Sequence, residues 1–137
     1  MGSTADRKAI VRDAFKAWDD GDAAGFETVY AADVKHPGHE IDGVDELQEI
    51  LDEWLSAFPD LSHTVEAMIA EGHWVATRFR ITGTHEGEFQ GIGPTGEEIE
   101  IRGMAMERVE NGEIVERWLV EDLLDFYLQL GAVERTN

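Results

Sequence analysis

Apolar residues recur at intervals of three to four over the first 58 positions, and this spacing predicts three helices. The first predicted helix spans residues 4–20 and has an apolar stripe that includes Trp18. A short second helix is expected at residues 23–31. The clearest pattern covers residues 44–58, includes Phe58 and stops before a proline.

From residue 61 onward the apolar period shortens to two, which is typical of strands. Residues 61–70 and 73–84 predict two strands, and residues 99–122 predict a hairpin around Asn111-Gly112. Helices followed by strands indicate an α+β fold, in which three helices pack against one curved antiparallel sheet. Because apolar residues occur on both faces of the strands, we expect the helices to cover one face and a second subunit to cover the other.

The register of the hairpin decides which side chains share a face of the sheet. A two-residue turn would place Glu107 directly opposite Glu116, and like charges in that position are destabilising. A three-residue loop at residues 110–112 avoids this contact and places Met104 opposite Trp118. The residues then predicted to share one face are Met104, Met106, Trp118 and Asp122.

The segment at residues 33–43 is predicted to be a loop, because it contains proline and glycine. His36, His39 and Glu40 within it have a spacing that could hold a metal ion. The Pro-Gly pair between the histidines excludes the helical geometry of a paired-histidine zinc site. We therefore expect no metal here, and either one histidine that faces a pocket or a plain surface loop.

A second loop, residues 83–96, is rich in glycine and contains His85. It is not a phosphate-binding loop, because neither a Lys-Ser/Thr pair nor a helix follows it. The loop is expected to fold over one end of the sheet. His85 would then be structural or exposed, or would line the mouth of a pocket.

The composition predicts one globular domain over residues 1–137, with 42% hydrophobic residues. There is no cysteine, so disulfides and cysteine-based sites are excluded. No apolar run approaches the roughly 20 residues of a membrane span, and the N-terminus lacks a signal-peptide core. These features predict a soluble protein of the cytoplasm.

The charge is strongly negative, with 30 acidic residues against 11 basic ones and a formal net charge of −19. This balance disfavours nucleic acids and anionic membranes as partners. The acidic residues are scattered along the whole chain, which indicates a solvated surface and not a charged tail. With so few lysines, the composition is typical of a protein from a salt-adapted organism.

Four motifs follow one another along the chain. They are D-G-D-A-A-G-F at residues 20–26, A-F-P-D-L at 57–61, G-T-H-E-G-E-F-Q-G-I-G-P-T-G at 83–96 and R-V-E-N-G-E-I-V-E-R-W-L-V-E-D at 108–122. Together they resemble the SnoaL-like polyketide cyclase (ester cyclase) family of the NTF2-like superfamily, from about residue 8 to Gly131. The resemblance implies a cone-shaped pocket between helices and sheet, a homodimer, and no metal or cofactor.

The resemblance also implies a role for Asp122, which corresponds to the aspartate that acts as general acid/base in an intramolecular aldol ring closure. Trp118 matches the aromatic position of the same segment. The chain departs from the cyclases where it has Met104 and Met106 in place of polar pocket side chains, and where Arg117 replaces a histidine.

Closing a ring by aldol chemistry requires a base for a proton next to a carbonyl and a group that stabilises the enolate. An apolar site around Asp122 would raise the pKa of its carboxyl and make it a better base. The candidates for the second polar group are His36, His39, His85 and Tyr30, with His36 paired to Asp122 in our assignment. The predicted pocket walls for a small hydrophobic molecule are Trp18, Phe58, Met104, Met106 and Trp118.

Three classes of function remain open on the sequence. The first is an enzyme of the cyclase type, or an isomerase or epoxide hydrolase on the same fold, the last using Arg78, Arg80 or Arg102. The second is a non-catalytic binder of an apolar molecule, which the two methionines favour. The third is a dimeric scaffold without a ligand.

Overall fold

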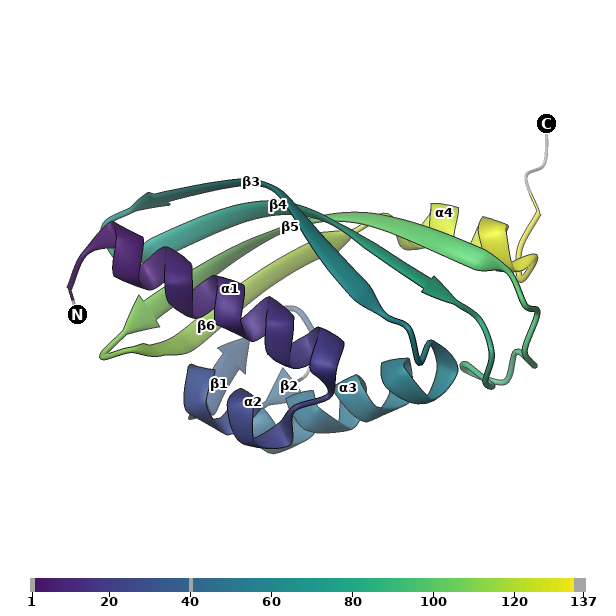
Figure 1. Ribbon diagram of the computed structural model, residues 1–137, viewed down its shortest axis with the longest axis horizontal. Helices are drawn as coiled ribbons and strands as arrows, with labels where there is room; N and C mark the ends of the chain where they lie inside the picture. Colours follow the sequence, from purple (N-terminus) through teal and green to yellow (C-terminus); the bar gives the residue numbers. More distant parts are fainter. Residues whose placement is uncertain (1, 40, 135–137) are drawn as a thin grey trace.

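The three N-terminal helices cover one face of a curved six-stranded sheet in the computed structural model, which describes residues 2–39 and 41–134 (Figure 1). The helices are α1 (Thr4–Asp20), α2 (Ala23–Val29), α3 (Val44–Ala57) and α4 (Leu123–Leu130). The strands are β1 (Tyr30–His36), β2 (Ile41–Asp42), β3 (Ser62–Glu71), β4 (Trp74–Thr84), β5 (Glu98–Glu110) and β6 (Glu113–Glu121). The predicted α+β fold, with three N-terminal helices on a curved sheet, is therefore confirmed.

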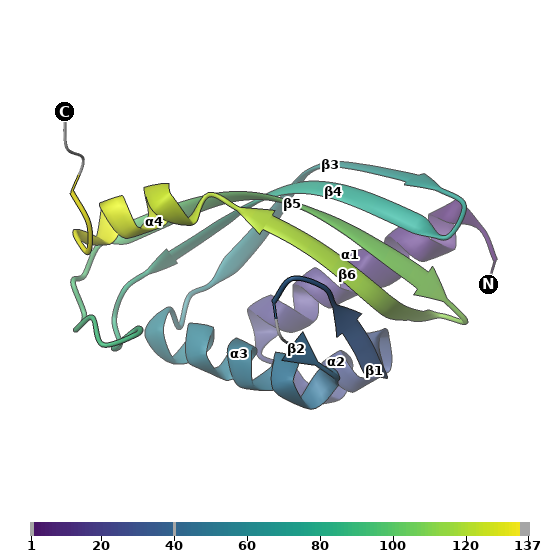
Figure 2. The same cartoon turned by 180° about the vertical axis from the view of Figure 1, so that it is seen from behind.

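The sheet has the strand order β2-β1-β6-β5-β4-β3 and stays open. Neighbouring strands are antiparallel except for β1 and β6, which run parallel. Seen from behind, β1 and β2 extend the sheet beside β6, and β1 lies in front of α2 (Figure 2). No helix within the described ranges is both long and apolar enough to cross a membrane.

Two predictions for the segment between α2 and α3 were wrong. The second helix ends at Val29, and the segment predicted to be a loop contains β1 and β2. Tyr30, Val34 and His36 are all buried in β1. The extended segment buries them against the helices while its backbone pairs with β6, which a loop would not do.

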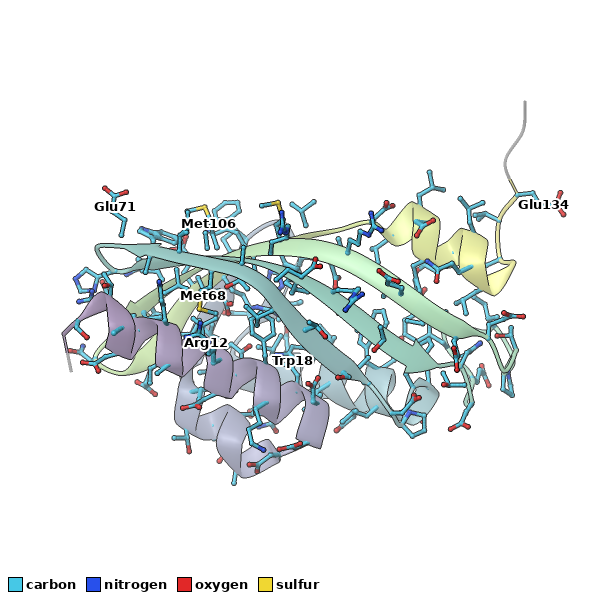
Figure 3. The ribbon with its side chains drawn as sticks, turned by 45° about the horizontal axis from the view of Figure 1, so that its top comes forward. Arg12, Trp18, Met68, Glu71, Met106 and Glu134 are labelled. Atoms are coloured by element: carbon cyan, nitrogen blue, oxygen red, sulfur yellow. The ribbon has the colours of Figure 1, made fainter. Side chains whose placement is uncertain are left out.

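Alternation along the strands separates a buried inner face of the sheet from an outer face. In β5, Ile101 and Ala105 are buried. Met104 and Met106, the two neighbours of Ala105 in the chain, are exposed. Figure 3 shows Met106 on the side of the sheet away from α1, with Met68 between the sheet and α1. The core therefore lies between the inner face and helices α1 and α3.

The β5–β6 hairpin has a different register from the predicted one. Its turn contains two residues, Asn111 and Gly112, which have φ values of 53° and 78°. The pairing then shifts by one residue at a bulge, so that Glu107 lies opposite Arg117 and not opposite Glu116. As a consequence Met106 pairs with Trp118, and Met104 pairs with Val120. The prediction of a three-residue loop was wrong because the bulge removes the like-charge contact that the loop was meant to avoid.

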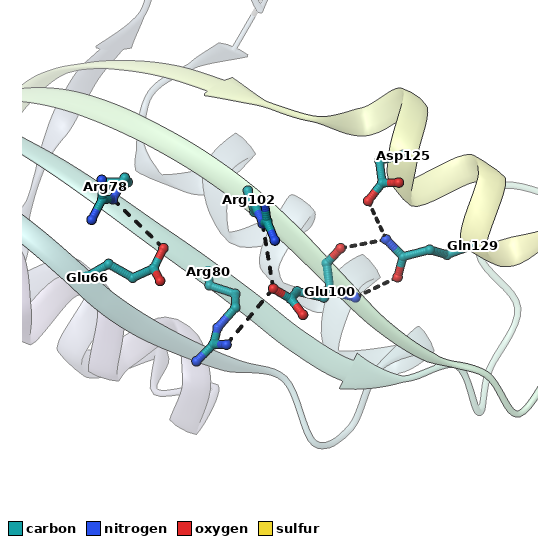
Figure 4. A network of polar contacts seen from close by, with 7 residues as sticks. All are labelled: Glu66, Arg78, Arg80, Glu100, Arg102, Asp125 and Gln129. Atoms are coloured by element: carbon teal, nitrogen blue, oxygen red, sulfur yellow. Dashed lines mark hydrogen bonds and ion pairs between the residues drawn. The ribbon is translucent and has the colours of Figure 1, made fainter.

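The outer face combines exposed apolar side chains with ion pairs. The exposed apolar residues are Ile69, Met104, Met106, Trp118 and Val120. Beside them, Arg78 pairs with Glu66 at 4.0 Å, and Glu100 lies 4.0 Å from Arg80 and 3.8 Å from Arg102 (Figure 4). We call this set of residues the outer patch.

Helix α4 begins where β6 ends. The Asp122 side chain accepts a hydrogen bond from the Asp125 backbone N–H at 3.1 Å, and the Asp122 N–H donates to the Arg102 carbonyl at 3.0 Å. At the other end of the helix, the Gln129 amide donates to the Glu100 carbonyl at 2.7 Å (Figure 4). Asp122 therefore acts as the N-cap of α4.

The left-handed turn of the hairpin gives a direct test of its geometry. We expect Gly112→Ala to lower the free energy of unfolding by about 1–2 kcal/mol, because a Cβ at positive φ is strained. Gly93→Ala is the matched control: a Cβ meets nothing within 4 Å at either position, but Gly93 has no positive φ. Urea denaturation of both variants measures the difference, and equal effects would contradict this turn geometry.

Candidate active site

A cavity of about 320 Å³ lies between the inner face of the sheet and helices α1 and α3. Aromatic side chains form much of its wall, among them Phe15, Trp18 and Phe79. The polar and titratable residues that line it are His36, His39, Glu53, His63, Gln90, Arg117, Glu121 and Tyr127. An apolar cavity with a few converging polar groups is the usual form of a site for a small molecule.

Glu121 is the carboxyl group that β6 directs to the cavity. It lies on the inner face because Arg117, Leu119 and Glu121 alternate with the outward Trp118 and Val120. Burial raises the pKa of Glu121, and the charges of Arg117, His63 and His39 act in the opposite direction. A carboxyl group with a raised pKa is a stronger base once ionised, which suits it to proton transfer.

Arg117 brings a permanent positive charge to the same wall. Its Nε lies 3.8 Å from the Glu107 carboxylate on β5, and its guanidinium carbon lies 5.4 Å from the Trp18 ring centroid. Among the described residues, Arg117 Nε has no hydrogen-bond partner. Since the side chain is buried and lines the cavity, its donors are available to an oxygen of a bound molecule.

Glu107 is the counter-charge of Arg117. Burial raises the pKa of Glu107, and Arg117 and then His63 oppose that rise. Two carboxyl groups, the buried Glu107 and the half-buried Glu121, thus respond to the same arginine. The arginine therefore sets the charge balance of the cavity wall.

His36 and His39 lie together at the β1 side of the cavity, with ring centroids 4.3 Å apart. Burial lowers the pKa of His36 to about 3, with smaller contributions from Arg117 and His39. His36 is therefore neutral near pH 7. No group of three or more His, Asp or Glu side chains in residues 2–39 and 41–134 could hold a metal ion, and Glu40 lies outside these ranges.

His63 and Asp19 form a hydrogen-bonded pair on the opposite side of the cavity. The Asp19 carboxylate lies 2.6 Å from His63 Nδ1 and accepts the His63 backbone N–H at 3.0 Å. The imidazole ring packs against Phe15 at 5.2 Å and Phe79 at 5.8 Å between centroids. Gly103 makes room for this arrangement, because a Cβ there would lie 2.7 Å from the Phe79 ring.

Of the residues predicted to line a pocket, the structure places three on this cavity, namely Trp18, His36 and His39. Three others lie in the core and do not line it. The Tyr30 hydroxyl accepts a hydrogen bond from Trp18 Nε1 at 2.9 Å, and burial raises the pKa of Tyr30 to about 12. Phe58 and His85 stack on each other, and His85 Nδ1 lies 3.0 Å from the Thr95 hydroxyl.

The remaining predicted residues lie on the outer face. Met104, Met106 and Trp118 share one face as predicted, but that face is the exposed one. Asp122 is exposed and caps α4, outside the residues that line the cavity. The expected position of Asp122 inside the pocket was wrong; its role as acid/base stays a prediction.

Reasoning from the sequence missed Arg117, Glu121, His63 and Asp19. A signal for the first two was present, because charged residues alternate with apolar ones along residues 98–102 and mark the outer face. The bulge sets the register of β6 against β5, and this register places Arg117 and Glu121 on the inner face. No local pattern links Asp19 to His63, which are 44 residues apart.

Comparisons with known proteins agree with this architecture. AclR from Streptomyces galilaeus, described as a candidate hydroxylase, is 30% identical over 98% of this chain and 87% of its own, with a TM-score of 0.88. IdmH from Streptomyces antibioticus, described as a candidate polyketide cyclase, is 29% identical over 91% of this chain and 98% of its own, with a TM-score of 0.81. No match was found among the curated proteins.

A further solved structure is similar to this chain in fold only. TsrD from Streptomyces laurentii is 23% identical over 96% of this chain and 98% of its own, with a TM-score of 0.88. The model of the SnoaL-like polyketide cyclase family matches residues 8–130. Since that match covers most of the chain and solved structures of such proteins share its fold, this protein belongs to the SnoaL-like polyketide cyclase family, with the NTF2-like fold.

Proposed function

We propose that the protein is a cofactor-independent enzyme that moves a proton next to a carbonyl group, as in an aldol-type ring closure. The substrate is a small hydrophobic carbonyl compound held in the cavity. One observation carries the proposal: Glu121 and Arg117, four residues apart on β6, both line the same apolar cavity. A base and an oxyanion donor on one wall are the two groups that enolate chemistry requires.

In this reaction the Glu121 carboxylate takes the proton from the carbon next to the carbonyl. The guanidinium of Arg117 donates hydrogen bonds to the carbonyl oxygen and stabilises the negative charge that develops there. The enolate carbon then attacks a second carbonyl of the same molecule. Glu121 returns its proton to the resulting alkoxide, so that one carboxyl group serves as base and then as acid.

The first prediction concerns this proton transfer, measured as deuterium exchange of the methyl ketone 4-phenylbutan-2-one in D₂O by NMR. Glu121→Gln should lower the enzyme-dependent exchange about 100-fold or more, because the general base is lost. Arg117→Lys should also lower it, since lysine keeps the counter-charge of Glu107 but loses the planar fork. Exchange by the wild-type protein should rise with pH as Glu121 ionises. Because the pKa of Glu121 is raised, this rise should occur at a higher pH than an ordinary glutamate would give.

Asp122→Asn separates this assignment from the one that the sequence suggested. Asp122 is the neighbour of Glu121 in the chain but lies outside the cavity. Exchange that survives in Asp122→Asn and is lost in Glu121→Gln supports the proposal. The reverse result would make Asp122 the acid/base and refute the role of Glu121.

Two alternatives from the sequence lead to different results. A non-catalytic carrier would bind the ketone in the cavity, and no variant would change exchange above the solvent background. An epoxide hydrolase based on Arg78, Arg80 or Arg102 is disfavoured, because all three arginines belong to the outer patch. The arginine of the cavity is Arg117.

We also propose that the protein is a homodimer in which the outer patch contacts a second copy. Exposed apolar side chains on a sheet face mark an interaction surface, and here Val120 is 75% and Met104 is 60% exposed. Arginines and glutamates alternate around them, so two copies related by a two-fold axis can pair opposite charges. Elsewhere on a chain with net charge −19, contact between copies would be repulsive.

Sedimentation equilibrium tests the dimer. We expect Met104→Glu to raise the dissociation constant at least about tenfold, because it buries an unpaired charge at the interface. Val133→Glu is the control, since Val133 is an exposed apolar residue outside the outer patch. A monomeric wild-type protein, or an equal effect of both substitutions, would refute this interface.

A last proposal concerns the acidity, which we attribute to adaptation to salt. The melting temperature should rise when KCl is raised from 0.1 to 1 M, because the screening length falls from about 10 to about 3 Å. Differential scanning calorimetry measures the rise at pH 7. The rise should shrink near pH 4.4, the isoelectric point of the sequence, where the net charge is close to zero. A melting temperature that does not respond to KCl at pH 7 would contradict this explanation.

A further inference from the structure

The Asp19–His63 pair has no task in the proton transfer assigned to Glu121. The Asp19 carboxylate accepts Nδ1–H and fixes the orientation of the ring. Within the part of the chain that the structure describes, the ring makes its one hydrogen bond through Nδ1. His63 lines the cavity, so its free nitrogen is the one that a bound molecule can meet.

His63 and Glu121 approach the cavity from different parts of the sheet. His63 lies on β3 and Glu121 on β6, with β4 and β5 between them in the strand order. The positive charge of His63 lowers the pKa of Glu121, against the effect of burial, so the two groups are within electrostatic reach. Asp19 and Glu107 are two further titratable groups that interact with His63.

An aldol closure requires only one acid/base group, whereas this cavity has two, Glu121 and His63, on separate strands. In that reaction the proton taken from carbon is returned to oxygen, and one carboxyl group can do both. Loss of water from a β-hydroxy carbonyl compound differs, because a proton leaves one carbon while another proton must reach the hydroxyl group on the next. A base and an acid must then act on neighbouring atoms in the same complex.

We propose that the Asp19–His63 pair gives the cavity a second activity, the dehydration of β-hydroxy ketones, with Glu121 as base and His63 as acid. The inference rests on the proposed function in its use of Glu121 and Arg117. The Glu121 carboxylate takes the proton from the α-carbon, and the electron pair of that bond forms the new C=C bond. The bond between the β-carbon and oxygen breaks, and the hydroxyl leaves as water with the proton of His63 Nε2.

Each residue of this step has a defined part. Asp19 is a positioning residue, which holds the ring and stabilises the imidazolium that donates the proton. Arg117 holds the carbonyl oxygen as the enolate develops. After the step Glu121 carries the α-proton and His63 is neutral, and exchange with solvent returns both to their starting states. The apolar walls, with Phe15 and Phe79 beside His63, favour a substrate with an aryl or alkyl group at the β-carbon.

One probe, 4-hydroxy-4-phenylbutan-2-one, reports both activities because its two routes give different products. Dehydration gives water and benzylideneacetone, which absorbs in the near ultraviolet. The reverse of an aldol addition gives benzaldehyde and acetone. Product analysis by liquid chromatography therefore separates the failure of this inference from the failure of the proposed function.

We expect the wild-type protein to form benzylideneacetone. His63→Gln and Glu121→Gln should each lower that rate about 100-fold or more, and His63→Gln should lower the formation of benzaldehyde by a smaller factor than the formation of benzylideneacetone. His73→Gln is the matched control: its Nδ1 also has a hydrogen-bond partner, the Val109 carbonyl at 3.0 Å, and His73 does not line the cavity. Asp19→Asn should lower kcat about tenfold or more with KM nearly unchanged.

Several results would overturn the inference. Wild-type protein that forms only benzaldehyde and acetone would refute the dehydration and leave the proposed function standing. Benzylideneacetone formation that persists in His63→Gln would refute the role of His63. Formation of neither product would refute both proposals. If His63→Gln does not fold, Asp19→Asn decides, because an unchanged kcat in that folded variant also overturns the inference.

Discussion

The buried pair of Glu107 and Arg117 is the interaction on which the cavity depends. The two side chains face each other across β5 and β6, and both are nearly inaccessible to solvent. A buried ion pair contributes little net stability, because desolvation offsets much of the attraction between the charges. Its consequence is electrostatic. The Arg117 charge lowers the pKa of Glu121 and of Tyr30 against the effect of burial, and it lowers the pKa of His36 together with burial, so one guanidinium acts on two groups of the cavity wall and on a tyrosine of the core.

The bulge in the hairpin makes this pair possible. With a regular two-residue turn, Glu107 would face Glu116, and two carboxylates would oppose each other. One extra residue on β6 changes that partner to Arg117 and leaves Arg108 opposite Glu116, 3.3 Å apart on the outer face. A single inserted residue thus places one opposite-charge pair inside and one outside. The inner pair carries the chemistry proposed here, and the outer pair adds to the charges around the outer patch.

The sequence predicted the elements well and the site poorly, for reasons that lie in particular residues. The three N-terminal helices, strands β3 to β6 and the shared face of Met104, Met106 and Trp118 follow from local periodicity, whereas β1 and β2 were missed. Periodicity groups residues by face but does not say which face the helices cover. That information lay in residues 98–102, where glutamate and arginine alternate with isoleucine and so mark the even positions as outward. The Asp19–His63 contact depends on tertiary structure, and no spacing could have revealed it.

The same contact explains how an edge strand and a surface helix come to share a site. β3 is the last strand of the sheet, and its backbone at His63 would lack an acceptor on that side without the Asp19 carboxylate. Asp19 therefore holds α1 to the sheet edge with both carboxylate oxygens and orients the imidazole with one of them, Oδ1. In our proposal, Asp19 therefore has two roles: it accepts the backbone N–H of the edge strand, and it positions His63 as the acid. One carboxylate thus accepts hydrogen bonds from two donors of His63, the backbone N–H and the ring Nδ1–H.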